Sequence, residues 1–259
     1  MRSIKHISII GSGNVATHLG KALYKKGLII DNVYSRKINR ARKLSDQLDA
    51  KACSKINQLS RESHLYLIAV SDVAISEVSD HVIDRVAPNA IIAHTSGSVS
   101  STEIKCDTSG VFYPLQSFSI DRGVEMKSVP FCIHSKNVKV KKLLLALARK
   151  LSDEVHQIDD KQRSILHLAA VFSSNFSNHM YHIAASICEE NKVDFDILKP
   201  LIIETAAKIK NATPYKMQTG PARRDDQITI KSHLKELSGN KSNKDIYKLI
   251  SQNIRSQYE

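Results

Sequence analysis

The feature that most constrains the fold is a short glycine motif near the start of the chain. Gly11, Gly13 and Ala16 are spaced as Gly-x-Gly-x-x-Ala, between the apolar segment 6–10 and a helical pattern over 14–26. In such a motif the first glycine allows a tight turn, the second lets a ligand approach the backbone, and the small third residue lets the helix pack on the strand. A pyrophosphate can bind at the helix N-terminus, where free N–H groups favour an anion. The motif predicts a dinucleotide site formed by Gly11, Ser12, Gly13, Asn14 and Val15, the alternative being a glycine turn that binds nothing.

Strand and helix patterns alternate through the first part of the chain. Strand patterns follow at 32–35, 65–70, 90–93, 111–113, 130–133 and 155–158, and helical patterns at 38–48, 73–86 and 136–151. Gly27 stands where a glycine often ends a helix. The nearly continuous apolar run 65–70 is typical of a strand buried on both faces of a parallel sheet. The alternation predicts an α/β domain whose parallel sheet is covered by helices on both faces.

The pattern changes after Asp159. Helical periodicity is present over 161–191, 195–211, 228–237 and 244–254, and no strand pattern follows. Pro200 is expected in the first turn of the second helix or at a kink in it. We therefore predict a dinucleotide-binding α/β domain over residues 1–159 and an all-α domain, for substrate binding or dimerisation, over residues 160–259.

Composition narrows the class of partner. Lys and Arg total 38 against 26 Asp and Glu, a net charge of +12, but the basic residues are spread along the chain and form no block. This spread favours solvated helix faces over nucleic-acid binding. No apolar run approaches the roughly 18–20 residues of a membrane span, and the N-terminus does not resemble a targeting signal, so we expect a cytoplasmic protein. The cysteines lie far apart, which predicts free thiols and no metal site: Cys53, Cys106, Cys132 and Cys188.

The residues that follow the second strand indicate whether NAD or NADP fits. NAD-binding proteins usually place an acidic residue there, whereas an arginine accommodates the extra phosphate of NADP. Here the strand is followed by Ser35, Arg36 and Lys37, with Arg40 one turn later. Asp31 precedes the apolar residues of the strand and should lie at its far end. We predict NADP as the cofactor, the alternative being that these cations are ordinary surface charges.

Polar residues also follow the next two strands. Ligands of open parallel sheets bind at the carboxyl ends of the strands, which brings Ser71 and the group His94, Ser96 and Gly97 to the same edge as the glycine turn. We expect these residues near the nicotinamide. For His94 the alternative is a side chain satisfied by local backbone.

Several motifs together resemble a known family of Rossmann-like proteins that carry a C-terminal domain of unknown function. The matching segments are residues 10–16, 94–98, 112–118, 167–176 and 220–226, so the resemblance covers nearly the whole chain. Members are described as NADP oxidoreductases, some as deazaflavin-dependent NADP oxidoreductase-like. The family is similar in architecture to pyrroline-5-carboxylate reductase and the beta-hydroxyacid dehydrogenases, which often dimerise through their helices. The resemblance implies a Rossmann-like domain, a helical domain and a homodimer.

The sequence departs from its relatives at two points. Many members of the family have Arg-Gly-Asp where this chain has Arg224, Asp225 and Asp226, so the glycine is lost. Beta-hydroxyacid dehydrogenases use a lysine four residues before an asparagine as the acid–base group, and Val171 occupies that position before Asn175. The chemistry of that relative therefore cannot be copied, and His167 or a bound water would have to handle a proton.

Three residues of the helical part are candidates for the chemistry. His167 and Asn175 recur at helical spacing with Val171 and His179, which predicts one shared face. We expect Asn175 in the cleft between the domains, close to Ser96 and Gly97. Arg224 is expected to bind an anionic group of a small substrate, because a guanidinium offers two parallel donors. The alternatives are a plain packing role for His167, a buried amide for Asn175 and an internal ion pair for Arg224, while Asp226 is a plausible N-cap.

Two functions remain open at this stage. The first is an NADP(H)-dependent oxidoreductase that transfers hydride to a small carbonyl or imine. The second is a dinucleotide-binding sensor or regulatory protein without turnover, which the missing lysine favours.

Overall fold

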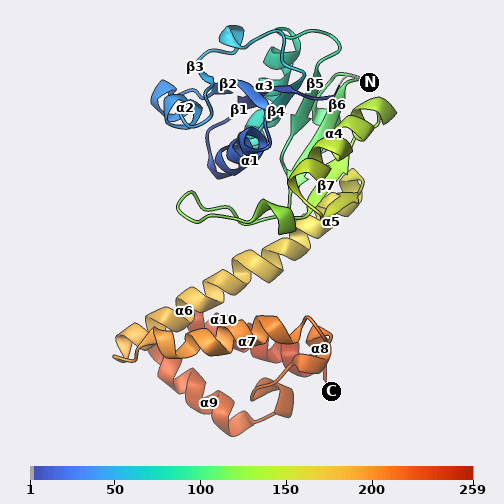
Figure 1. The fold of residues 1–259 in the computed structure, drawn as a ribbon. Coiled ribbons are helices and arrows are strands. Elements are labelled where there is room, and N and C mark those ends of the chain that lie inside the picture. The colour runs from blue at the N-terminus through green and yellow to red at the C-terminus, as the bar shows by residue number, and fades with distance from the viewer. Residues whose placement is uncertain (1–2, 259) are drawn as a thin grey trace. The chain divides into compact units, whose positions relative to one another are not determined.

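The chain divides into two compact units. The computed structural model describes residues 3–258, and the division falls between Ser174 and Asn175. The first unit contains the sheet and the second is helical (Figure 1). The division lies inside the long helical stretch that follows the last strand, so the domain boundary at residue 159 stays a prediction.

One sheet of eight strands organises the first unit, within the residues described. Its order is β3-β2-β1-β4-β5-β6-β7-β8. The strands are β1 His6–Ile10, β2 Ile29–Tyr34, β3 Lys51–Cys53, β4 Leu65–Ile68, β5 Ile91–His94, β6 Ser109–Pro114, β7 Phe131–His134 and β8 Val155–Gln157. The chain runs outward from β1 to β3 and then returns to the other side of β1 as β4. The carboxyl ends of β1 and β4 therefore flank a topological switch point, where open α/β sheets bind ligands.

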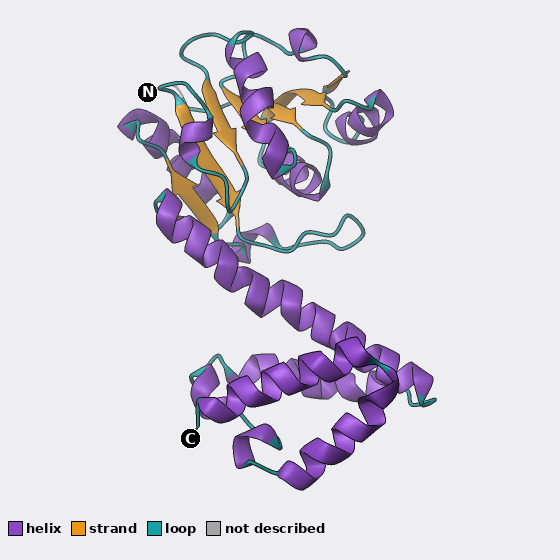
Figure 2. Ribbon diagram, turned by 180° about the vertical axis from the view of Figure 1, so that it is seen from behind, coloured by secondary structure: helices purple, strands orange, loops and turns teal. Residues whose placement is uncertain are grey.

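Helices cover both faces of this sheet, as the opposite views in Figures 1 and 2 show. They are α1 Asn14–Lys25, α2 Ile38–Ser45, α3 Ile75–Ile83, α4 Val138–Leu151 and α5 Asp160–Ala170. One buried apolar cluster joins β1, β2 and β7 to α1, α2 and α4. A second cluster packs β4 and β5 against α3, with Ile68, Ile75 and Val82 at its centre. The predicted α/β architecture is confirmed.

Helix α1 ends as its sequence predicts. Gly27 has a φ of 75°, which L side chains adopt only with strain. Its N–H donates to the carbonyl of Tyr24, and the N–H of Leu28 donates to the carbonyl of Leu23. This pair of bonds is the Schellman motif. It turns the chain sharply into β2 and so helps to set the position of the glycine turn at the other end of α1.

The sheet differs from the expected one at two strands. Strand β3 was not expected, because Lys51, Ala52 and Cys53 form a short segment of mixed polarity whose strand conformation comes from pairing with β2. Strand β7 runs antiparallel to β6, so the expected parallel sheet is mostly, but not entirely, parallel. The connection from β6 to β7 contains no crossover α-helix, and without a crossover the next strand returns in the opposite direction. Helix α4 then carries the chain across, so that β8 is parallel to β7.

The second unit consists of short helices. A π-helical turn, Val171–Phe176, spans the division between the units and leads into α6 Ser177–Glu190. The others are α7 Lys199–Lys208, α8 Pro214–Met217, α9 Gln227–Glu236 and α10 Lys241–Ser256, of which α8 was not expected. Pro200 lies in the first turn of α7, one of the two positions expected for it. No helix within residues 3–258 is long and apolar enough to cross a membrane.

Candidate functional site

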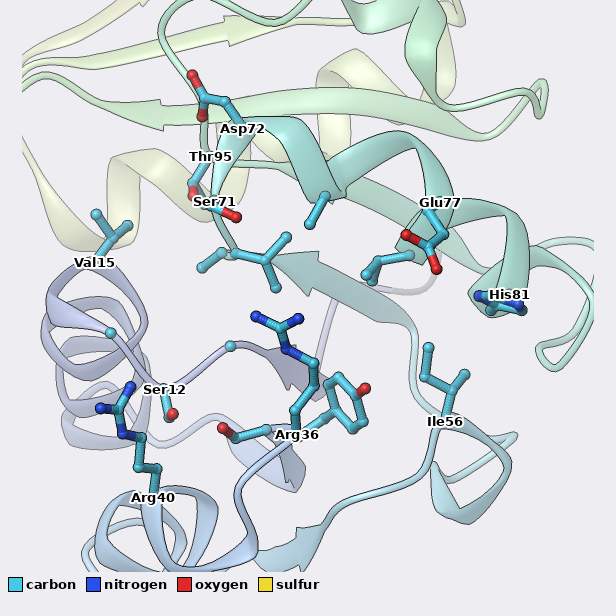
Figure 3. Close-up of a pocket in the computed structure, with 18 of the residues that line it drawn as sticks. Ser12, Val15, Arg36, Arg40, Ile56, Ser71, Asp72, Glu77, His81 and Thr95 are labelled. Carbon is cyan, nitrogen blue, oxygen red and sulfur yellow. The ribbon is translucent and has the colours of Figure 1, made fainter.

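A cavity of about 990 Å³ opens at the switch point of the sheet. It is lined by the segments that follow β1, β2, β4 and β5, all from the first unit (Figure 3). Of the predicted cofactor residues, the lining includes Gly11, Ser12, Gly13, Asn14, Val15, Ser35, Arg36, Ser71 and Ser96. Lys37, His94 and Gly97 are not among the lining residues.

The glycine turn has the geometry of an anion cradle. Gly11 has a φ of 128°, and a Cβ there would lie 2.2 Å from the carbonyl oxygen of Ala69, so only glycine fits. A Cβ on Gly13 would meet no atom within 4 Å, so its backbone is open to an approaching group. Gly13 is also the N-cap of α1 and supplies no side-chain cap. The first N–H groups of α1 are therefore available to an anion.

The side chain of Asn14 has a structural partner. Its Nδ2 donates to the carbonyl oxygen of Phe118 at 2.8 Å. One turn later, His18 Nε2 donates to the carbonyl oxygen of Ser119 at 2.9 Å, and the His18 ring stacks on the Phe118 ring. These contacts hold the connection between β6 and β7 on the first turns of α1. A contribution of Asn14 to cofactor binding would come from its backbone N–H.

Three arginines line the cavity: Arg36 and Arg40 come from the segment after β2, and Arg85 follows α3. The Arg36 guanidinium extends into the cavity, and Arg40 also lines it (Figure 3). Neither Arg36 nor Arg40 forms an ion pair with a described residue. Lys37 instead occupies the N-cap position of α2.

Asp31, the acidic residue of strand β2, is hydrogen-bonded to residues outside the cavity. Asp31 Oδ1 is bonded to His6 Nδ1 at 2.9 Å, and Oδ2 accepts from Ser63 Oγ at 2.5 Å. Asp31 does not line the cavity. The carboxylate that could have favoured NAD therefore does not reach the cavity. The sequence pattern placed Asp31 before the strand, but β2 begins at Ile29, so Asp31 lies within it.

The loops after β4 and β5 are joined by hydroxyl groups. Ser96 Oγ accepts from the N–H groups of Ser98 and Val99, both at 3.1 Å. Ser98 Oγ in turn donates to Asp72 Oδ2 at 2.5 Å. Asp72 and Thr95, which belong to the two segments expected at this edge of the sheet, both line the cavity. These bonds fix the shape of the loop that follows β5.

His94 supports this loop from inside the unit. The side chain is fully buried, and its Nδ1 accepts from the N–H of Ser96 at 3.2 Å. Burial, and then the charge of Arg163, lower the pKa of His94 to about 4, so the ring is neutral near pH 7. Its Nε2 has no hydrogen-bond partner among the described residues. The local backbone thus satisfies Nδ1 of His94, as the alternative interpretation expected, but it does not satisfy Nε2.

Next to Ser96, two rings pack against the backbone of Gly97. A Cβ on Gly97 would lie 2.7 Å from His167 Nδ1 and 2.8 Å from Tyr113 Cζ. The hydroxyl of Tyr113 and Nδ1 of His167 are 3.2 Å apart, within hydrogen-bond distance. Burial raises the pKa of Tyr113 to about 12. The predicted residues Gly97 and His167 thus meet within the first unit, together with a tyrosine that sequence reasoning did not select.

A buried ion pair fixes helix α5 to the same loop. Arg163 is 1% exposed; its Nη1 donates to Asp160 Oδ1 at 2.7 Å, and its Nη2 donates to the carbonyl oxygen of Val99. Asp160 Oδ2 accepts from the Ser100 hydroxyl and from both the N–H and the hydroxyl of Ser101, each at 2.8 Å. Burial opposes ionisation, but these hydrogen bonds together hold the pKa of Asp160 well below its usual range. His167 lies one helical turn beyond Arg163, so its place beside Gly97 is set by this anchor.

The remaining catalytic candidates belong to the second unit. Asn175 and Arg224 are both exposed there. The Arg224 guanidinium makes no hydrogen bond or ion pair with a described residue. Asp226 caps α9, as expected, by accepting from the N–H of Thr229 at 3.0 Å. Hydrogen bonds from Thr229, and to a smaller extent the charge of Arg224, lower the pKa of Asp226. The roles of Asn175 and Arg224 stay predictions.

Asp225 explains the glycine that many relatives have at its position. It has a φ of 51° and a ψ of 35°, the left-handed conformation that glycine adopts without strain. An Asp tolerates this conformation better than most side chains. The loss of glycine has therefore not changed the direction of the backbone here.

The described residues contain no group of three or more His, Cys, Asp or Glu side chains arranged to hold a metal ion. The four cysteines are free thiols.

Two family models match the chain. A Rossmann-like domain matches residues 2–113, and a domain of unknown function, DUF2520, matches residues 129–254. No curated protein gives a significant match.

Solved structures give further similarities. A structure of a putative NADP oxidoreductase from Bacteroides fragilis has 38% sequence identity and a TM-score of 0.93, over 98% of each chain. Protein TM1727 from Thermotoga maritima has 23% identity and a TM-score of 0.73, over 97% of this chain and 98% of that one. An imine reductase from Myxococcus stipitatus in complex with NADP⁺ has 13% identity and a TM-score of 0.67, over 97% of this chain and 92% of that one. The last two similarities are below 25% identity and show the shared fold alone.

Proposed function

Because the chain belongs to the family of Rossmann-like proteins that carry the DUF2520 domain, we propose that it is an NADP(H)-dependent oxidoreductase acting on a small carbonyl or imine. The relative from Bacteroides fragilis, which is 38% identical to this chain, is described as a putative NADP oxidoreductase. When bound, the cofactor supplies the hydride, and the protein supplies binding, orientation and electrostatics.

The observation that carries the proposal is the pairing of an open anion cradle with two arginines. Gly13 and the uncapped N-terminus of α1 fit a pyrophosphate. Arg36 and Arg40 face the same cavity from the end of β2, where the ribose phosphate of NADP would lie. Asp31 is bonded to His6 and Ser63 and offers no competing carboxylate to a ribose hydroxyl there. The residues present therefore fit NADP better than NAD.

The first test compares the two cofactors. Arg36→Ala should weaken NADPH binding by about 10- to 100-fold, because a charged hydrogen bond contributes about 1.5–3 kcal/mol. NADH binding should change much less, since NADH lacks the 2′-phosphate. Isothermal titration of both cofactors measures the difference.

Arg42→Ala is the matched control. Arg42 is in the last turn of the same helix as Arg40 and does not line the cavity, so both affinities should stay at the wild-type values. An equal loss of NADPH and NADH affinity in Arg36→Ala would show that Arg36 does not contact the 2′-phosphate.

The substrate side is assigned to three residues. We propose that His167 handles the proton, Asn175 orients the substrate or the nicotinamide amide, and Arg224 binds an anionic group of the substrate. Following NADPH absorbance over a panel of carbonyls and imines, with and without a carboxylate, identifies a substrate. Arg224→Ala should then raise KM for carboxylate substrates only, and Asn175→Ala should lower kcat. Wild-type kinetics in either variant would remove that assignment.

A sensor without turnover is the second candidate. The observation that favours it is Val171, which stands where beta-hydroxyacid dehydrogenases have a catalytic lysine. NADPH binding with no turnover over the whole panel would support this function.

We also propose that the functional particle is a homodimer formed through the helical unit. Among the described residues 175–258, the buried apolar side chains are limited to Cys188 and Ala222, and each is still 8% exposed. Large apolar residues are exposed along these helices, including Ile197, Leu201, Ile203, Ile228 and Leu249. A second copy of the chain is the partner that would bury such a surface by symmetry.

A further inference from the structure

We propose that Tyr113 is a positioning residue, which donates its hydroxyl proton to Nδ1 of His167 so that Nε2 of His167 presents a proton to the oxygen of a carbonyl substrate. The proposal rests on the proposed function and narrows its substrate class from carbonyls and imines to carbonyls.

The pair is held in place from three sides. The Tyr113 hydroxyl is 3.2 Å from His167 Nδ1, and both rings pack against Gly97, where no Cβ would fit. Tyr113 is on β6 and is paired with Cys132 of the neighbouring strand. His167 is on α5, which Arg163 anchors to the loop after β5. The residue before Gly97, Ser96, lines the cofactor cavity, so the pair lies beside that end of the cavity.

The direction of the hydrogen bond follows from what each group can satisfy. His167 Nδ1 is the described partner of the Tyr113 hydroxyl, and a hydroxyl proton left without an acceptor in a part-buried site costs about 1–3 kcal/mol. Burial raises the pKa of Tyr113 to about 12, so the phenol keeps its proton near pH 7 and can donate it. A donor at Nδ1 places the proton of the neutral imidazole on Nε2. Nε2 of His167 has no hydrogen-bond partner among the described residues.

In the proposed reduction, each electron pair and proton has a defined destination. As the carbonyl carbon receives the hydride, the electron pair of its double bond moves to oxygen, and oxygen takes the proton from His167 Nε2. Nδ1 takes the proton of Tyr113 in the same event, so the imidazole stays neutral and the negative charge ends on the phenolate. Solvent then returns a proton to Tyr113. Burial is the largest influence on the pKa of Tyr113 and raises it, as do Cys132 and Asp72, while the positive charge of Arg163 lowers it, so the phenolate regains its proton readily.

The same arrangement distinguishes carbonyls from iminium ions. An iminium ion already carries its proton and becomes a neutral amine when it receives hydride, so it needs no proton donor. A carbonyl oxygen becomes strongly basic as the hydride arrives and gains from a donor aimed at it. The neutral Tyr113–His167 pair would therefore assist the reduction of a carbonyl and would have no role in the reduction of an iminium ion.

The first experiment does not depend on turnover. In the full-length protein labelled with ¹⁵N-histidine, the Nδ1 resonance of His167 should show the shift of a nitrogen that accepts a hydrogen bond, with the proton on Nε2. Tyr113→Phe should move this resonance to that of an unbonded nitrogen. An unchanged resonance in Tyr113→Phe, or a proton on Nδ1 in the wild-type protein, would overturn the proposal.

Tyr66→Phe is the matched control. It also removes a tyrosine hydroxyl from the first unit, one that donates to the carbonyl oxygen of Ser60 at 2.5 Å. Tyr66→Phe should leave the His167 resonance and kcat unchanged, and its melting temperature shows how much a lost buried hydroxyl alone destabilises this unit.

The second experiment measures catalysis on a carbonyl substrate found in the panel. Tyr113→Phe should lower kcat about 100-fold, in the range for a lost proton donor, with KM and the NADPH affinity nearly unchanged. In a His167→Gln background the same change should have almost no further effect, because Tyr113 acts through His167. Additive losses in this double-mutant cycle would overturn the proposal.

The outcomes separate this proposal from the proposed function. Carbonyl turnover that is equal in the wild type and Tyr113→Phe would overturn the role of Tyr113 and leave the oxidoreductase intact. Turnover of imines alone would overturn the narrowed substrate class. NADPH binding without any turnover would overturn the function and this proposal together.

Discussion

Two histidines of the first unit show that position, more than residue type, decides what an imidazole can do. His94 and His167 were both candidates from the sequence, one at the end of a strand and one on a helix. The structure buries His94 completely and commits its Nδ1 to the N–H of Ser96. His167 is half-buried and has one nitrogen without a described partner. Burial of this kind depends on what packs around the side chain, which the local sequence does not state.

The buried His94 predicts a pH dependence of stability. Its pKa in the folded chain is about 4, below the unfolded value near 6.5, so the unfolded state binds the proton first as the pH falls. The contribution is complete above about pH 6.5 and is lost between about pH 6.5 and 4, with a total of about 3 kcal/mol. The midpoint of urea unfolding at several pH values measures this loss.

His94→Gln should flatten the profile in that window, whatever its effect at pH 7. His134→Gln is the control, since the half-buried His134 ends β7, which is separated from the strand of His94 by β6. A slope between pH 6.5 and 4 that is the same in His94→Gln and the wild type would show that another group titrates there.

Only the part of the candidate site that is formed by neighbouring residues could be predicted from the sequence. Gly11, Gly13 and Arg36 act through local geometry, at a turn and at a strand end, so the sequence spacing was enough to place them. Tyr113 and His167 are 54 residues apart, and Arg163 and Val99 are 64 apart. Nothing in either neighbourhood predicts that these partners meet, so they were found only in the fold.

At the scale of elements, the π-helical turn corrects a prediction from periodicity. The shared face of His167, Val171, Asn175 and His179 assumed 3.6 residues per turn throughout. Val171–Phe176 is π-helical, with i→i+5 hydrogen bonds and more residues in each turn. The regular spacing is therefore not kept through this segment. The sequence predicted that a long helix exists here but not its local winding, since no proline or glycine marks the change.

The ion pair between Arg163 and Asp160 predicts that two Asp→Asn substitutions lower the free energy of unfolding by different amounts. Asp160→Asn removes the charge that pairs with the buried Arg163, so it should destabilise the protein by about 3 kcal/mol, because an unpaired buried guanidinium remains. Asp153→Asn breaks an ion pair with Lys127 in which both side chains are 70% exposed, and should cost less than about 1 kcal/mol. Thermal melting of the two variants compares them. Equal melting temperatures would mean that the Arg163 pair does not hold α5.

At the scale of the whole molecule, the proposed homodimer would bury the exposed apolar side chains of the helical unit. Light scattering at micromolar concentration should return a mass twice 28.9 kDa. Leu201→Asp combined with Ile203→Asp should shift the protein towards the monomer, because a charge in an apolar interface is costly. Val138→Asp, an equally exposed position on α4 of the first unit, is the control and should leave the mass unchanged. A wild-type particle of 28.9 kDa would contradict the dimer.

Gly97 has a consequence for how this chain can vary over generations. Every single-base change that replaces a glycine by another residue introduces a Cβ, and a Cβ at Gly97 would lie less than 3 Å from both the Tyr113 and the His167 ring, so the two rings would have to shift. Gly97 itself does not line the cofactor cavity, so such a change would leave the cradle around Gly13 intact. A natural homologue with any other residue at this position is therefore expected to keep the dinucleotide and lose the reaction. The residue at position 97 would then distinguish homologues that can carry out the proposed reaction from homologues that only bind the dinucleotide.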